Sequence, residues 1–237
     1  MKLTEARVLV VDDEISLREM FAKWLRASGC ADVRVAADGE EALAAIQLAP
    51  IDVLITDVRM PVMDGVTLVR RLAEEGERVA CIIFVSAFSD IDPREMYDLG
   101  VEAFLAKPFR LEELATALNH AIADRPTLWR TPMAIPPRQS VCFGADPDGD
   151  DQATEYLRLG RGGFSAHSPE PLGLGKIAFR CCASSGQPEL MGQGYVRWRS
   201  RVDHTVGIEF AYLDSPGREW VVEELFNESP RSFIPAL

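Results

Sequence analysis

The sequence has few cysteines and no long apolar run. Its five cysteines show no CxxC spacing, so we expect buried cytosolic thiols and neither a zinc site nor a disulfide framework. The opening stretch, MKLTEARVLVVDDE, carries three charges before a short apolar run at residues 8–11. A stretch of this kind is typical neither of a signal peptide nor of a membrane span. We therefore expect a cytoplasmic protein without membrane insertion.

Positive charge is scarce as well. The net charge is -12, and most of it lies in the first half: residues 1–124 hold 13 Lys and Arg against 23 Asp and Glu, whereas residues 125–237 hold 12 against 14. An acidic first half argues against binding along a nucleic acid backbone. The second half lacks a helix-turn-helix pattern and a basic surface, which disfavours a DNA-binding transcriptional regulator.

The length of 237 residues predicts two domains. In the first, short apolar runs alternate with amphipathic stretches. The runs occupy residues 8–11, 33–36, 53–55, 81–85 and 101–105, and the stretches occupy residues 15–27, 40–48, 66–74, 93–99 and 111–123. The alternation predicts an α/β fold, a doubly wound five-stranded parallel sheet with helices on both faces. Ligands of such sheets bind beyond the carboxyl ends of the strands.

Charged and polar side chains stand at these predicted strand ends. Asp12 and Asp13 follow the first strand and Asp57 follows the third. Ser86 and Lys107 follow the fourth and the fifth. Clustered carboxylates repel one another unless a cation neutralises them, and Mg²⁺ takes carboxylate oxygens and water as ligands. The sequence therefore predicts a magnesium site at this edge of the sheet.

In combination these residues resemble the receiver domain of two-component response regulators. The matching motifs are DD at 12–13, D-x-x-M-P-x-x-D-G at 57–65, SA at 86–87 and KPF at 107–109. The resemblance implies a receiver over residues 1–123, with Asp57 accepting a phosphoryl group from a histidine kinase or a phosphotransfer protein. The chemistry at Asp57 is then the protein's own phosphorylation and dephosphorylation, and no further enzymatic activity is expected.

The same resemblance implies roles for the neighbours of Asp57. Lys107 and Ser86 contact the phosphoryl group, and Mg²⁺ is held by Asp12, Asp13, Asp57 and the backbone carbonyl of Arg59. Ser86 and Phe104 form a switch that alters the surface of the fourth helix, fifth strand and fifth helix. That surface then either pairs two receivers as a homodimer or releases the second domain for a partner.

The second half begins with a proline-rich segment, residues 124–139, which we expect to be an extended linker. After it the apolar pattern has a period of two. The predicted strands occupy residues 140–144, 155–159, 176–182, 193–199 and 205–212, and residues 215–227 are predicted to be a helix. Regular short strands indicate a small antiparallel β-barrel, here with a C-terminal helix, over residues 140–237.

This second pattern resembles a PilZ domain, a bacterial module that binds cyclic di-GMP. The matching stretches are RGGFSA at 161–166, GKIAF at 175–179, GYVRW at 194–198 and GIEF at 207–210. The family's two binding motifs are degenerate: only Arg130 fits the Arg pair RxxxR, with Arg125 displaced by one, and only Gly163 survives of D/N-x-S-x-x-G. Arg158 and Arg161 lie in the second motif and remain available to attract an anion.

Three functions follow from this organisation. The favoured one is a phosphorylation-controlled adaptor whose PilZ-like output domain binds an unidentified downstream protein. The alternative is an effector that combines phosphorylation with cyclic di-GMP binding, which the degenerate motifs make doubtful. The third is a DNA-binding transcriptional regulator, which the second half does not favour.

Overall fold

The computed structural model describes residues 1–77, 79–87, 91–143, 157–168, 170–181, 189–228 and 232–236. The chain divides into two compact units. The first comprises Met1–Asp90 and Val101–Ala123, and the second comprises Ile91–Gly100 and Asp124–Leu237. Within the described residues, no helix is long and apolar enough to cross a membrane.

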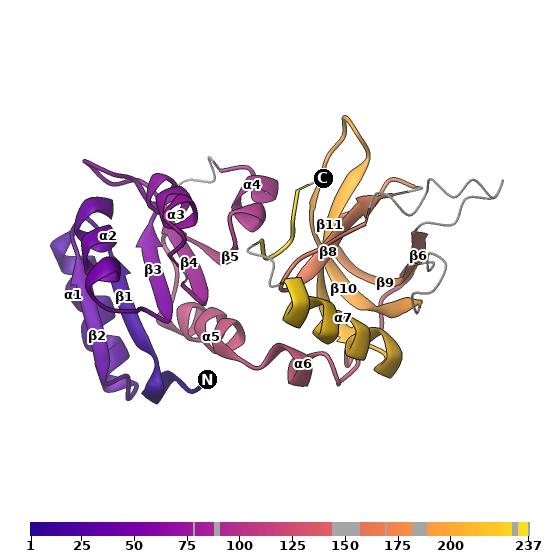
Figure 1. The fold of residues 1–237 in the computed structure, drawn as a ribbon, viewed down its shortest axis with the longest axis horizontal. Helices are drawn as coiled ribbons and strands as arrows, with labels where there is room; N and C mark the ends of the chain where they lie inside the picture. The colour runs from indigo at the N-terminus through magenta and orange to yellow at the C-terminus, as the bar shows by residue number, and fades with distance from the viewer. Residues whose placement is uncertain are drawn as a thin grey trace. The chain divides into compact units, whose positions relative to one another are not determined.

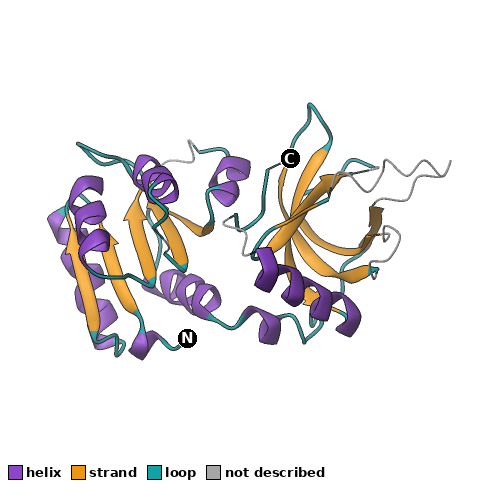
Figure 2. Ribbon diagram, viewed as in Figure 1, coloured by secondary structure: helices purple, strands orange, loops and turns teal. Residues whose placement is uncertain are grey.

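The first unit is built on a five-stranded parallel sheet in the order β2-β1-β3-β4-β5 (Figures 1 and 2). The predicted doubly wound parallel sheet is thus confirmed. The elements are η1 Leu3–Glu5, β1 Arg7–Val11, α1 Ile15–Ala27, β2 Asp32–Ala36, α2 Gly39–Leu48, β3 Val53–Asp57, α3 Gly65–Glu74, β4 Cys81–Ser86, β5 Val101–Ala106 and α5 Leu111–Ile122.

Burial on both faces of the sheet explains its continuous apolar runs. All of β3 and β4 is buried, as are four of the five residues of β1. The helices α1 and α5 pack on one face, where their apolar side chains meet alternate residues of β1, β3 and β4. Asp38 caps α2 and Asp64 caps α3, because their carboxylates accept backbone N–H groups of the first turn. The helices are therefore held by both burial and capping.

The second unit contains a six-stranded sheet in the order β6-β9-β10-β11-β8-β7. Its elements are α4 Pro93–Asp98, α6 Arg125–Leu128, β6 Gln139–Phe143, β7 Arg158–Leu159, β8 Gly163–His167, β9 Gly175–Cys181, β10 Leu190–Arg199, β11 Thr205–Leu213 and α7 Ser215–Glu228. Phe143, Phe164, Phe179 and Phe210 pack against one another in its core with edge-on or tilted rings, and Trp129 meets Phe210 edge to face. This aromatic cluster gives the unit a hydrophobic core of its own.

The predicted second sheet exists, but one of its pairings differs from the prediction. β6 runs parallel to β9, whereas the other neighbours are antiparallel. A parallel pair requires a long crossover, and the 31 residues at 144–174 between these strands are sufficient for one. The predicted antiparallel sheet is therefore confirmed except for the parallel pair of β6 and β9, and closure of this sheet into a PilZ-like barrel stays a prediction.

Other differences lie at the element boundaries. The proline-rich segment opens with the short helix α6, because Pro126 stands in its first turn, where proline's missing N–H costs nothing. Strand β8 was not among the predicted strands, since its polar and glycine residues hide the alternation. Of the predicted strand at 155–159, residues 158–159 form β7, and residues 155–156 lie outside the described residues, as does Cys182.

Candidate functional site

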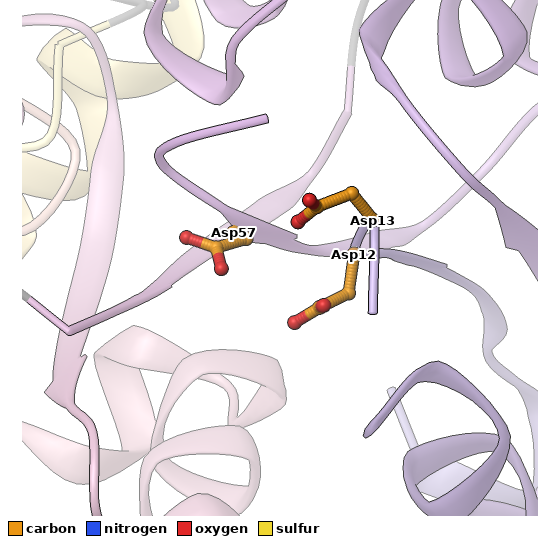
Figure 3. Close-up of side chains that lie close together, drawn as sticks. All are labelled: Asp12, Asp13 and Asp57. Atoms are coloured by element: carbon orange, nitrogen blue, oxygen red, sulfur yellow. The ribbon is translucent and has the colours of Figure 1, made fainter. Parts of the chain in front are cut away.

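Three carboxylates meet at the carboxyl edge of the first sheet. Asp12 and Asp13 follow β1, and Asp57 is the last residue of β3. Since Val11 pairs with Thr56, the next residue of each strand reaches the same level of the edge. One oxygen from each carboxylate lies within 4.8 Å of the others (Figure 3). The structure thus brings together the three acidic residues that the sequence predicted to converge.

Burying ionised carboxylates costs free energy unless positive charge or hydrogen-bond donors lie beside them. Asp12 is 1% exposed and Asp57 9%, while Asp13 is exposed. Backbone N–H groups offset part of that cost: Glu14 donates to Asp12 Oδ1 at 2.9 Å, and Arg59 donates to Asp57 Oδ1 at 3.1 Å. A buried carboxylate needs such partners to remain ionised.

Lys107 supplies the main countercharge. Its Nζ lies 2.8 Å from Asp12 Oδ2 and 2.6 Å from Asp57 Oδ2. Its backbone N donates to the carbonyl of Ser86 at 2.7 Å, which joins the end of β5 to the end of β4. One ammonium group therefore bridges the carboxylates of two strands.

The protonation of this trio reflects both burial and pairing. Burial raises the pKa of Asp12 above its ordinary value, although the hydrogen bonds from Lys107 and Glu14 oppose that rise. Burial alone would lower the pKa of Lys107, but the hydrogen bonds to Asp12 and Asp57 outweigh it and raise that pKa. Lys107 therefore remains charged at neutral pH.

The donor set fits a hard divalent cation. Three carboxylates and one ammonium leave a formal charge of -2, and the ligand atoms offered are all oxygens. Mg²⁺ prefers such oxygens and keeps several waters. Asp12, Asp13 and Asp57 are the residues that would hold it. The carbonyl of Arg59 stays a predicted ligand; the backbone N–H of the same residue donates to Asp57.

The loop after Asp57 depends on a close approach that only glycine allows. A Cβ on Gly65 would lie 2.3 Å from the carbonyl oxygen of Asp57, and Gly65 N donates to the carbonyl of Val58 at 2.9 Å. Asp64 then caps α3 by accepting from Thr67 N at 2.7 Å. The D-G pair at the end of the motif therefore folds the loop back against the strand that carries Asp57.

Ser86 and Phe104 lie on neighbouring strands of the same unit. Ser86 is 1% exposed at the end of β4, and Phe104 is half-buried on β5, paired with Phe84. Arg18, which the sequence did not single out, donates from its guanidinium to the carbonyl of Asp12. Arg18 lies within α1, six residues after Asp12, and not at the end of a strand. The search of strand ends in the sequence therefore could not find it.

Three of the four arginines predicted for a nucleotide or anion site contact groups of the chain itself. Arg158 donates to the carbonyl of Ala236 at 3.2 Å and Arg161 to that of Gly100 at 3.0 Å. The guanidinium carbon of Arg125 lies 4.7 Å from the centre of the Phe233 ring. Arg130 is exposed, and Gly163 lies in β8, where a Cβ would meet the carbonyl of Ile208.

Comparison with known proteins concerns mainly the first half of the chain. Residues 8–119 match the family described as the response regulator receiver domain. "Transcriptional regulatory protein PdtaR" of Mycobacterium tuberculosis is 37% identical over 118 residues, 49% of this chain and 57% of that protein. "Probable transcriptional regulator ycf27" of Cyanophora paradoxa is 35% identical over 134 residues, 55% of each. The chain thus spans about half the length of these curated relatives.

Solved structures give a similar match. The chemotaxis protein CheY4 of Vibrio cholerae is 38% identical, with a TM-score of 0.46 over 49% of this chain and 98% of that one. A response regulator receiver protein from Pseudomonas putida is 33% identical, with a TM-score of 0.45 over 48% of this chain and 96% of that one.

Proposed function

We propose that this chain, whose residues 8–119 are a response regulator receiver domain, takes a phosphoryl group onto Asp57 from a histidine kinase or a phosphotransfer protein. The observation that carries the proposal is the placement of Lys107 Nζ between the carboxylates of Asp12 and Asp57. An ammonium group there faces the position where a phosphoryl group on Asp57 would carry negative charge.

The chemistry requires little more than positioning. A carboxylate oxygen of Asp57 attacks phosphorus and forms an acyl phosphate, while the P–N bond of the donor histidine breaks and its electron pair stays on the ring nitrogen. Water later cleaves the acyl phosphate to regenerate Asp57 and release phosphate. Such a transfer depends mostly on in-line geometry and on cations at the equatorial oxygens. When bound, Mg²⁺ supplies one of these positive charges, and Lys107 supplies another.

Ser86 is proposed to change its position when Asp57 is phosphorylated. It stands at the end of β4, next to β3, where Val85 pairs with Asp57. A phosphoryl group adds about 1.5 to 2 negative charges and strong acceptor oxygens. We expect the Ser86 hydroxyl to donate to one of these oxygens and Phe104 to follow its movement, so that the signal reaches the surface of the domain.

The second unit is proposed to act as a PilZ-like output that binds a downstream protein. Its support is the separate core, the second sheet and the resemblance of its strands to that family. The contacts of Arg125, Arg158 and Arg161 with the chain's own groups favour this adaptor over cyclic di-GMP binding. The names of the two curated relatives point to transcriptional regulation, but those proteins match over about half of this chain.

Intact mass after incubation with acetyl phosphate tests the central assignment. The wild type should gain one phosphoryl group in the presence of Mg²⁺ and none after chelation. Asp57→Asn should gain none. Asp64→Asn is the matched control, because asparagine caps α3 as well as aspartate and the substitution removes a nearby exposed charge. Modification of Asp57→Asn at the wild-type level would refute the assignment.

A further inference from the structure

The segment Ile91–Gly100 is covalently part of the receiver but packs in the second unit. It lies within the family match at residues 8–119, between β4 and β5 of the first sheet. In the structure it forms one compact unit with Asp124–Leu237. Arg94 illustrates the packing, since its guanidinium lies 3.3 Å from a carboxylate oxygen of Asp203 and 5.4 Å from the centre of the Trp198 ring.

Residues 232–236 are the second component of this arrangement. Phe233 and Ile234 are fully buried, and the backbone N–H groups of both point to the carbonyl of Tyr97, at 2.9 and 3.3 Å. The Phe233 ring lies 5.9 Å from the Tyr97 ring. Asp98 accepts from Ser232 Oγ at 3.1 Å and from Ala236 N at 2.9 Å. Four of the residues at 232–236 thus contact Tyr97 or Asp98 at the end of α4, beside which this segment runs (Figure 1).

The turn between β7 and β8 also binds this segment, through the backbone of Ser232 and Phe233. Arg161 N donates to the carbonyl of Ser232, and Gly162 N donates to that of Phe233, both at 2.9 Å. A Cβ on Gly162 would lie 1.9 Å from the Phe233 ring, and one on Gly160 would lie 2.6 Å from the Phe233 carbonyl. Gly160 and Gly162 therefore leave the space that Phe233 occupies. Phosphorylation at Asp57 does not require these glycines.

We infer that residues 232–236 are an internal latch, which holds Ile91–Gly100 against the second sheet and is loosened when Asp57 is phosphorylated. The coupling part of this inference rests on the proposed function. It follows from connectivity: Ile91–Gly100 begins five residues after Ser86 and ends four residues before Phe104. A movement of these two residues pulls on both ends of the segment that the latch holds. By reciprocity, whatever weakens the latch favours the phosphorylated arrangement.

Asp98→Ala is the smallest change that removes the contact between α4 and residues 232–236. Asp98 is exposed, and its carboxylate joins α4 to Ser232 and Ala236. Amide hydrogen exchange of residues 93–100 should become faster by about five-fold or more, the lower end of typical coupling between sites. Asp98→Asn is the matched control: it removes the same charge at the same position, and its amide oxygen can still accept from Ser232 Oγ and Ala236 N. A chain truncated after residue 231 should show a larger effect than Asp98→Ala.

The coupling is tested with beryllofluoride and Mg²⁺ on the wild type, as a stand-in for the phosphoryl group. Faster exchange of residues 93–100 is expected. Unchanged exchange in both Asp98→Ala and the chain ending at residue 231 would overturn the latch. If the wild type gains a phosphoryl group by intact mass but beryllofluoride leaves residues 93–100 unchanged, the coupling is refuted and the proposed function stands. Absence of any phosphoryl gain would instead refute the proposed function.

Discussion

Lys107 bonds two carboxylates that would otherwise repel each other in a mostly buried site. The sequence alone placed Lys107, Asp12 and Asp57 at strand ends, and the structure brings them within hydrogen-bond distance. Prediction succeeded here because the ends of parallel strands converge by topology, whatever the details of packing. Arg18 could not be found in that way, since its contact with the Asp12 carbonyl depends on the tilt of a helix.

Replacing Lys107 should impair phosphorylation without removing the nucleophile. Lys107→Ala removes a cation that faces the site of phosphoryl charge, and loss of one such electrostatic contact typically costs roughly 10²-fold in rate. Lys107→Arg keeps the charge but spreads it over a planar fork, so an intermediate rate is expected. The rate of acetyl phosphate labelling, followed by intact mass, measures both. A rate for Lys107→Ala within two-fold of wild type would contradict the assigned role.

Asp52 provides a pH-dependent contribution to the stability of the first unit. The Arg7 side chain donates to both of its carboxylate oxygens, at 2.8 and 2.6 Å, and these contacts hold the pKa of Asp52 below its usual range. A lowered pKa in the folded state means that the stabilisation is present above the unfolded value near pH 4 and is lost as pH falls through the folded value.

Asp52→Asn should therefore lower the urea midpoint at pH 7, and the difference from wild type should shrink as the pH is lowered towards 3. Circular dichroism during urea unfolding gives the midpoints. Asp32→Asn serves as the control, because the Asp32 side chain is 41% exposed against 19% for Asp52, and pairs closer to solvent contribute little. If the difference in urea midpoint between Asp52→Asn and wild type stays constant from pH 7 to pH 3, the lowered pKa of Asp52 does not contribute to stability.

At the scale of elements, the loop from β3 to α3 is held by glycine where side chains have no room. Gly65→Ala should destabilise the first unit by roughly 1–3 kcal/mol, because its Cβ would lie 2.3 Å from the Asp57 carbonyl oxygen and force the loop to move. It should also slow phosphorylation. Gly173→Ala, where a Cβ would meet nothing within 4 Å, is the control. Equal thermal midpoints for the two variants would show that the close approach is not required.

In the second unit, sequence patterns predicted some helix and strand bounds but not the pairing of strands or the packing of distant segments. Residues 205–212 and 215–227 were predicted close to β11 and α7, since alternation and an N-terminal Ser-Pro are local signals. The parallel pairing of β6 with β9 was missed, because partner choice depends on contacts far along the chain. Packing of Ile91–Gly100 with residues 232–236 was missed for the same reason: no periodicity joins segments more than 130 residues apart.

At the scale of the whole molecule, the proposed function assigns the output to the second unit. Calorimetric titration of the full chain with cyclic di-GMP should show no saturable binding at low micromolar ligand. Relative to an intact PilZ motif, Arg158 replaces a carboxylate or amide and Gly160 replaces a hydroxyl. Each lost hydrogen bond is worth roughly 1–3 kcal/mol, which together weaken affinity about ten-fold to ten-thousand-fold. Saturable binding at low micromolar ligand would promote the second-messenger effector over the adaptor.

Chemical trapping of the phosphorylated residue tests most directly whether Asp57 accepts the phosphoryl group. Borohydride reduces an aspartyl phosphate to homoserine, which peptide mass mapping then locates in the chain. After labelling with acetyl phosphate and Mg²⁺, homoserine is expected at position 57, with Asp12 and Asp13 unmodified. Homoserine at Asp12 or Asp13, or none at Asp57 in a labelled sample, would contradict this expectation.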